Sequence, residues 1–331
     1  MRIVRRAIEI ARKQGIANAV AKTVLYLVPS AAIMPSPVSR DDAVAVDWRS
    51  PGRWSTAPRQ LPAGPLTIAW IMSPPGANSG GHQNIFRFIR VREDAGHRVR
   101  VHITSQIDPT TPEQSAALVA ASSSYADIEA PITALPAGGV GDDVDVIVAT
   151  GWETTYPAFL DASDARRMYF VQDYEPWFTA MSSEHVLAEN TYRFGFHGIT
   201  AGRWLEAKLR DEFGMSTAAY DFGSDPGHYS VLTRERRDGV FFYARPETAR
   251  RGFELGVLAL QLVHEERPDA RIILAGQDVS KHKLPFPYES PGVMQVGDLN
   301  GHYNRCAVGL VLSLSNMALL PLELLGAGVV P

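Results

Sequence analysis

Strand-like and helix-like segments alternate along most of this chain, and that alternation constrains the fold more than any other feature. Residues 66–72 form a short apolar run that ends in a loop rich in Pro and Gly, and helical apolar spacing follows at residues 84–95. The pattern continues with apolar runs at residues 99–104 and 144–150. Strands that alternate with helices in this way predict a parallel sheet covered by helices.

The alternation begins a second time near residue 239. Strands predicted at residues 168–172 and 197–200 close the first series, and a strand at 239–243 with a helix at 253–266 opens the second. The second series continues with predicted strands at 271–275, 293–296 and 308–314 and a short helix at 319–325. The fold class expected is therefore α/β, with two Rossmann-like domains.

Three parts of the chain are expected. Residues 66–225 form the first Rossmann-like domain, and residues 226–331 form the second, which we expect to be truncated at its C-terminus because a new strand begins at the chain end. Residues 1–65 combine a basic amphipathic segment (1–28) with a Pro-rich connector that we predict to be irregular. The amphipathic pattern is typical both of a helix on an anionic membrane surface and of a helix packed on its own protein.

Charge and cysteine content exclude several classes of function. The net charge of -4 gives no basic field for nucleic acid. The single cysteine, Cys306, excludes an internal disulfide and a multi-thiolate metal site. No apolar run approaches the ~18 residues that a membrane helix needs. We therefore expect a cytoplasmic protein, soluble or peripheral at the inner face of the cell membrane through residues 1–28.

Small and basic residues gather where predicted strands end, and the cleft at such ends is the usual ligand site of doubly wound domains. Gly80 and Gly81 follow the first strand and open a helix, where a phosphate or sugar can approach backbone amides. A plain tight turn is the alternative. The glycines do not form the Gly-x-Gly-x-x-Gly dinucleotide fingerprint, which disfavours a dehydrogenase.

Arginines follow the first strand of the second series. Arg245 ends that strand, and Arg250 and Arg251 open the next helix. Two such cations can clamp a diphosphate and neutralise the charge that develops as a nucleotide leaves, whereas a solvated cluster is the alternative. Glu323 lies in an otherwise apolar helix, so its carboxylate needs a partner, either a ribose diol or an arginine.

Four segments share their order and spacing with a known family. They are residues 79–82 (SGGH), 149–154 (ATGWET), 169–176 (YFVQDYEP) and 199–205 (ITAGRWL). From about Leu66 to Pro331 the chain resembles the family 4 glycosyltransferases of GT-B fold, most closely the WsaF-like rhamnosyltransferases. The resemblance implies two Rossmann-like domains facing across a cleft, and a retaining sugar transfer that needs a nucleotide-sugar co-substrate but no cofactor and no metal.

The resemblance also assigns donor-binding roles. The diphosphate-binding Arg and Lys of the family correspond to Arg245 and Arg250, with Arg251 as an alternative. Gly297, Asp298 and Leu299 correspond to the segment whose backbone reads the base. Glu323 corresponds to the ribose ligand.

One position departs from the family pattern. Ser315, beside Asn316, occupies the place of the first glutamate in the Glu-x7-Glu motif. The sugar-side contact is therefore altered, which fits a deoxysugar or marks a weakened enzyme. In the linker, Gly223-Ser224-Asp225 followed by Tyr229 occupies the place of a family motif.

Acceptor-side candidates come from the first domain. His82 and Asp173 can orient or deprotonate an acceptor hydroxyl, although Asp173 is equally interpreted as a satisfied loop carboxylate. Gln172 and the aromatic residues Tyr174, Trp152 and Trp177 are candidate sugar contacts, although aromatics more often belong to a core. Asp143-Val144-Asp145 resembles a metal motif but lies at the entry of a strand, so we predict no metal site.

The function expected is transfer of rhamnose from dTDP-rhamnose to a polysaccharide or lipid-linked glycan. A sugar-nucleotide epimerase of GT-B fold and a non-catalytic glycan-binding subunit are the alternatives. A donor incubated with and without glycan distinguishes the first alternative, and glycan binding without nucleotide binding distinguishes the second.

Overall fold

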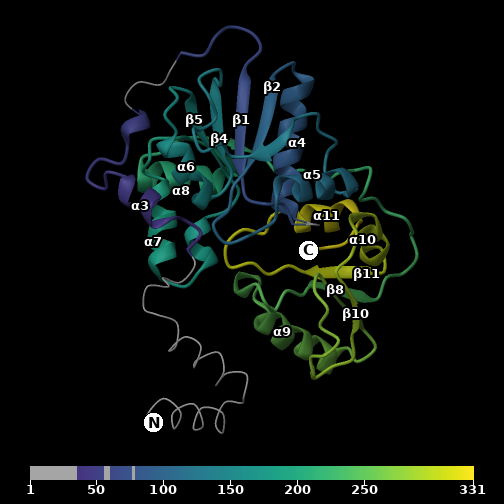
Figure 1. The fold of residues 1–331 in the computed structure, drawn as a ribbon. Coiled ribbons are helices and arrows are strands. Elements are labelled where there is room, and N and C mark those ends of the chain that lie inside the picture. Colours follow the sequence, from purple (N-terminus) through teal and green to yellow (C-terminus); the bar gives the residue numbers. More distant parts are fainter. Residues whose placement is uncertain (1–35, 56–59, 77–78) are drawn as a thin grey trace, which may run out of the picture. The chain divides into compact units, whose positions relative to one another are not determined.

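Two parallel sheets organise the residues that the computed structural model describes, which are residues 36–55, 60–76 and 79–331 (Figure 1). Both sheets belong to one compact unit, Val38–Pro331. The named strands pair in parallel throughout, and helices separate most of them along the chain. The predicted α/β class is therefore confirmed. The amphipathic pattern at residues 1–28 lies outside the described residues.

The first sheet contains seven strands in the order β3-β2-β1-β4-β5-β6-β7. They are β1 (Thr67–Met72), β2 (Arg98–Ile103), β3 (Ile132–Ala134), β4 (Val146–Ala149), β5 (Arg166–Val171), β6 (His197–Ala201) and β7 (Ser216–Tyr220). The helices between them are α4 (Gly80–Asp94), α5 (Pro112–Ala121), α6 (Trp152–Leu160), η2 (Glu175–Phe178), α7 (Ser183–Thr191) and α8 (Arg203–Phe213). Every residue of β1 is buried, and Ile71 packs in a different core from Trp70, so both faces of this central strand are covered.

The second sheet contains four strands in the order β10-β9-β8-β11. They are β8 (Gly239–Tyr243), β9 (Arg271–Ala275), β10 (Glu289–Gly292) and β11 (Cys306–Leu310). The helices are η3 (Ala249–Arg251), α9 (Phe253–Glu266), α10 (Val296–Tyr303) and α11 (Leu320–Gly326). The predicted bounds of β8, β9 and α9 are confirmed. Val330 pairs with Val308 of β11 in a single parallel bridge.

Two predictions for the second sheet were wrong. The strand expected at residues 293–296 is instead β10 at Glu289–Gly292, and Val296 begins α10. β10 contains Pro291, which is tolerated because β10 is an edge strand. The last strand also ends at Leu310, earlier than expected, and the chain continues as a loop to α11.

The prediction of an irregular connector was wrong for residues 36–55. This stretch contains α3 (Arg40–Ala45) and η1 (Arg53–Ser55), and Ser39 caps α3 by accepting a hydrogen bond from the Asp42 amide at 3.0 Å. The indole of Trp54 donates to the Phe159 carbonyl at 3.1 Å. The connector therefore packs on the first sheet's helices.

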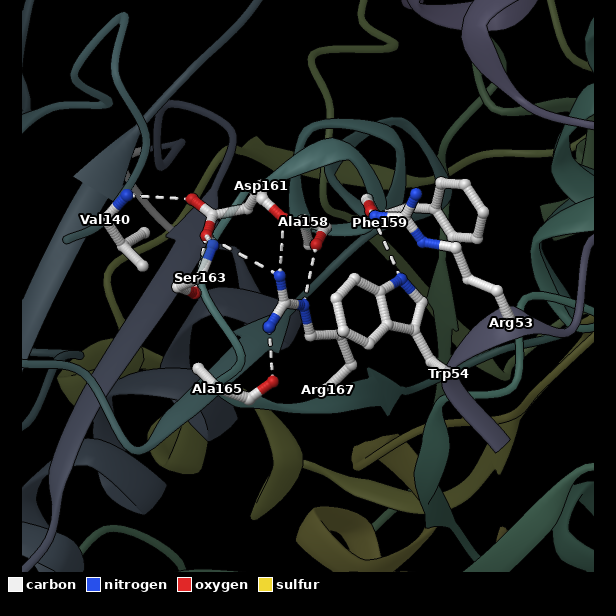
Figure 2. A network of polar contacts seen from close by, with 9 residues as sticks. All are labelled: Arg53, Trp54, Val140, Ala158, Phe159, Asp161, Ser163, Ala165 and Arg167. Atoms are coloured by element: carbon white, nitrogen blue, oxygen red, sulfur yellow. Dashed lines mark hydrogen bonds and ion pairs between the residues drawn. The ribbon is translucent and has the colours of Figure 1, made fainter. Parts of the chain in front are cut away.

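A buried arginine anchors the connector (Figure 2). The Arg167 side chain is fully buried, donates to the carbonyls of Ala158, Ala165 and Asp161, and lies 3.5 Å from the Asp161 carboxylate. The Trp54 ring covers it, with its centroid 3.8 Å from the guanidinium carbon. Burial lowers the pKa of Arg167 to about 10, which leaves it charged at neutral pH.

The structure shows no membrane-spanning element in the part of the chain that it describes: none of those helices is both long and apolar enough to cross a bilayer.

Candidate functional site

Loops from the two sheets meet through residues that follow β5 and β11. The Ser315 hydroxyl donates to Oδ2 of Asp173 at 2.8 Å, and the Asn316 side chain donates to the Gln172 carbonyl at 2.8 Å. These partners lie more than 140 residues apart along the chain. The structure therefore brings four of the predicted site residues into direct contact, and it does so at the carboxyl ends of parallel strands.

The loop between β11 and α11 holds this junction together. Its Leu314 amide donates to the Arg250 carbonyl at 2.8 Å, and its Asn316 carbonyl accepts from the Arg251 guanidinium at 3.2 Å. Ala318 in the same loop has a φ of 55°, in the left-handed region that residues with a Cβ rarely adopt. Backbone strain of this kind is often found at functional sites.

Three arginines concentrate positive charge at this junction. Arg250 lies 3.9 Å from the Asp173 carboxylate, while Arg245 donates to the Tyr243 hydroxyl at 3.0 Å. Within the described chain, the buried Nε atoms of Arg245 and Arg250 have no hydrogen-bond partner. Burial lowers the pKa of Arg250 and of Arg251, and the neighbouring guanidiniums lower both further. Cations that are buried and mutually repelling favour an anionic ligand.

Asp173 supplies a single negative charge against this cluster. Its Oδ1 accepts from the Tyr174 amide at 2.8 Å, and its carboxylate is largely buried. Burial raises the pKa of Asp173 above its usual value, while the Ser315 hydroxyl and the Tyr174 amide lower it in part. The Asp173 carboxylate thus lies between the Ser315 hydroxyl and the Arg250 guanidinium and contacts both.

The glycine loop after β1 is occupied by protein contacts. Gln172 donates to the Gly81 carbonyl at 3.0 Å, and a Cβ at position 81 would lie 3.3 Å from that amide nitrogen. Gly81 therefore permits a close approach of Gln172, whereas the position of a Cβ on Gly80 is open. The predicted role of both glycines toward a donor stays a prediction.

His82 is held in its neutral form. Its Nδ1 lies 2.8 Å from the Ser79 hydroxyl, and burial lowers its pKa to about 4, with the Ser73 backbone opposing that shift. A neutral imidazole can still hydrogen-bond an acceptor hydroxyl, but it brings no positive charge to a leaving diphosphate.

Glu323 forms hydrogen bonds with tyrosines, and the charge of Arg87 also acts on its carboxylate. The Tyr303 hydroxyl donates to Oε2 at 3.0 Å, and Tyr229 also hydrogen-bonds the carboxylate. Burial raises the pKa of Glu323, and these hydroxyls lower it in part. A ribose would have to share this carboxylate with the tyrosines.

The segment expected to read the base lies in the first half of α10. Gly297 and Asp298 are exposed there, and the partly buried Leu299 packs against the hydrophobic core of the second sheet. Asp298 also lines a hollow beside Met294 and Gln295, and the arginine that lines this hollow is Arg305. The role of this segment toward a base stays a prediction.

Two predicted acceptor contacts are placed in the core. Trp152 is 8% exposed and Tyr174 is 3% exposed, and both belong to the core of the first sheet. The Tyr174 hydroxyl donates to Glu189 at 3.3 Å. Each ring packs among buried side chains of this core and offers no free face to a sugar, so these two assignments are corrected. By contrast, Trp177 is 42% exposed.

The carboxylates at the entry of β4 have protein partners. Asp143 pairs with Arg100 at 3.0 Å, and Asp145 accepts from the Thr67 amide at 2.8 Å. Among the described residues, no cluster of three or more His, Cys, Asp or Glu side chains is arranged to hold a metal ion.

The two Rossmann-like sheets define a GT-B glycosyltransferase fold. Sucrose-phosphate synthase from Thermosynechococcus elongatus is similar, with a TM-score of 0.58 and 14% identity over 80% of this chain and 80% of that chain. An O-GlcNAc transferase variant from Thermobaculum terrenum is similar with a TM-score of 0.51 and 15% identity, over 97% of this chain and 66% of that one. Similarity at such low identity shows the fold alone.

The similar sequences are closer to this chain than the similar structures are. Residues 238–331 match the family described as WsaF, C-terminal domain. The O-antigen biosynthesis protein RfbC of Myxococcus xanthus is 31% identical over 284 residues, which cover 80% of this chain and 21% of that protein. The chain thus spans about a fifth of the length of this curated relative. The resemblance to the WsaF family that the sequence predicts is confirmed for residues 238–331.

Proposed function

We propose that this chain is a glycosyltransferase that moves a sugar from a nucleoside diphosphate to a glycan during the assembly of an O-antigen or a similar polysaccharide. The observation that carries the proposal is the cluster of Arg245, Arg250 and Arg251 at the carboxyl end of β8, with one carboxylate beside it. A nucleoside diphosphate supplies the negative charge that this cluster lacks. The GT-B fold and the similarity to an O-antigen biosynthesis protein support the same class of reaction.

The finer proposal is that the donor is dTDP-rhamnose, the acceptor a polysaccharide or lipid-linked glycan, and the transfer retaining and metal-independent. As the bond from the sugar to the diphosphate breaks, negative charge grows on the leaving oxygen, and Arg245 and Arg250 stabilise it. The leaving diphosphate then accepts the proton of the attacking hydroxyl, which Asp173 or His82 orients by hydrogen bonding. Resemblance to the WsaF-like rhamnosyltransferases supports the choice of sugar.

Arginine substitutions test the donor site. In Arg245→Ala and Arg250→Ala we expect dTDP and UDP to bind about tenfold to a hundredfold more weakly, because each change removes a charge-assisted contact. Isothermal titration calorimetry measures the dissociation constants. Arg267→Ala is the matched control, since Arg267 is an exposed arginine that follows α9 and pairs with Asp269. Unchanged nucleotide affinity in both cluster variants would overturn the proposal.

The reaction itself is tested with dTDP-rhamnose. Incubation with and without glycan separates transfer from hydrolysis or epimerisation, and the anomeric configuration of the product, read by NMR, separates retention from inversion. Turnover of the donor without any acceptor would favour the epimerase instead.

A further inference from the structure

Two tryptophans form an exposed aromatic pair next to the junction of the two sheets. Trp177 belongs to η2 and Trp204 to α8, and their ring centroids lie 5.9 Å apart at an interplanar angle of 36°. They are 42% and 53% exposed, respectively. We call this pair the tryptophan platform. Large aromatic surfaces in contact with water at a defined place commonly mark a binding surface.

The platform is held by its neighbours. Tyr174 meets the Trp177 ring edge to face at 4.9 Å, and the Lys208 ammonium lies 4.5 Å from the Tyr174 ring and 5.5 Å from the Trp177 ring. Lys208 is fixed in turn by Glu212 at 2.7 Å. A ring that is fixed before a ligand arrives loses little side-chain entropy on binding.

The platform continues directly into the candidate site. Phe178 follows Trp177, and the Arg250 guanidinium lies 4.1 Å from the centre of its ring. Asp173, at the start of the segment that links β5 to η2, contacts Ser315 across the junction. A chain-like ligand on the platform would therefore have one end near Asp173 and the arginines.

The charge around the platform favours a neutral ligand. In α8 the basic residues Arg203, Lys208 and Arg210 are balanced by the acidic residues Glu206, Asp211 and Glu212. The adjacent helix α7 contains Glu184 and Glu189 but no Lys or Arg. An anionic lipid surface requires a basic excess, which these helices lack. The C–H faces of sugar rings are apolar and uncharged, so they suit an indole pair.

We propose that the tryptophan platform binds the acceptor glycan, with successive sugar rings stacked on Trp177 and Trp204 and the terminal ring directed toward Asp173. This inference rests on the proposed function, because it assigns the acceptor side of the same site. It replaces Trp152 and Tyr174, whose rings are buried, as the aromatic acceptor contacts.

The test is a titration of the complete chain with soluble tetrasaccharides of rhamnose, mannose, galactose and glucose. Saturation-transfer NMR measures the binding of each tetrasaccharide. We expect at least one of them to bind, and Trp177→Ala and Trp204→Ala each to weaken that binding about fivefold to tenfold. Trp204→Tyr should retain most of the affinity, because it keeps an aromatic face. Trp48→Ala is the control, since Trp48 is another partly exposed tryptophan, in the connector.

Two further measurements separate a failure of the tryptophan platform from a failure of the donor site and from lipid binding. Affinity for dTDP and UDP should be unchanged in Trp177→Ala and Trp204→Ala, so failure of the donor site and failure of the platform are read independently. Binding to phosphatidylglycerol vesicles should not depend on Trp204. The inference is overturned if no tetrasaccharide binds, if the losses do not exceed that of Trp48→Ala, or if the substitutions abolish vesicle binding and leave glycan binding intact.

Discussion

Burial determines the chemistry available to single side chains at this site. His82, Asp173 and Arg250 are all ionisable, but burial raises the pKa of Asp173 and lowers the pKa of the other two. The sequence gives the types and order of these residues, and hence the prediction that they gather at strand ends. It does not give the contact between Ser315 and Asp173, because the two are separated by 142 positions and meet only when both sheets have formed.

His82 provides a prediction at this scale. Burial lowers the pKa of His82 from the ordinary histidine value of 6.5 to about 4, so the folded state favours the neutral ring. Folding therefore loses stability as the pH falls from about 6.5 to about 4, because the unfolded chain binds the proton first. In an NMR titration of the imidazole we expect a midpoint well below 6, and His82→Asn should lose less stability than the parent chain over this range. A midpoint at the ordinary histidine value would contradict this account.

At the scale of elements, the sequence predicts the segments with strong periodicity and misses those without it. The bounds of α9 follow directly from its apolar spacing, whereas α6 was not predicted because Pro157 lies inside it. The edge strand β7 was also missed, since its residues are mostly exposed or half-buried and lack the apolar run of a central strand. Edge strands depend on the neighbour that they pair with, and a local pattern does not contain that information.

The helices of the connector, residues 36–55, were also missed from the local sequence pattern. Their packing on the first sheet supports a prediction about stability. Trp54→Ala uncovers the buried Arg167 guanidinium and leaves the Phe159 carbonyl without its indole donor. We expect the free energy of unfolding to fall by about 3 kcal/mol. Trp54→Phe keeps a ring over Arg167 but loses the N–H group, so we expect a loss of about 1 kcal/mol. Thermal and denaturant unfolding measure both.

Nucleotide binding serves as the internal control for this prediction. Arg167 lies near the start of β5, whereas Asp173 follows the end of that strand, so the dTDP affinity of a folded Trp54→Ala protein should not change. An unfolding midpoint equal to that of the parent chain would show that the connector does not anchor the first sheet.

Across the described unit, polar contacts join the two sheets through the site, beside the contact of the Arg250 guanidinium with the Phe178 ring. The Asn316 side chain reaches the Gln172 carbonyl, Ser315 reaches Asp173, and Arg250 lies opposite the same carboxylate. A glutamate at position 315 would place a second carboxylate beside Asp173, so the serine matches its partner on the other sheet. Ser315, the position that departs from the family pattern, is thus paired with Asp173 of the other sheet. The sequence around Ser315 does not show this pairing by itself.

Under the proposed function, Asp173 competes with the diphosphate of the donor for the arginines. Asp173→Asn keeps an oxygen to accept from the Tyr174 amide and an N–H group to donate to Ser315, but it removes the negative charge 3.9 Å from Arg250. The Asp173 carboxylate repels the negatively charged diphosphate of dTDP. We therefore expect its removal to tighten dTDP binding by about threefold to tenfold, with the larger effect at low salt. The same change should slow sugar transfer if Asp173 orients the acceptor hydroxyl. Weaker dTDP binding in Asp173→Asn would mean that the carboxylate holds the arginines in place for the diphosphate and does not compete with it.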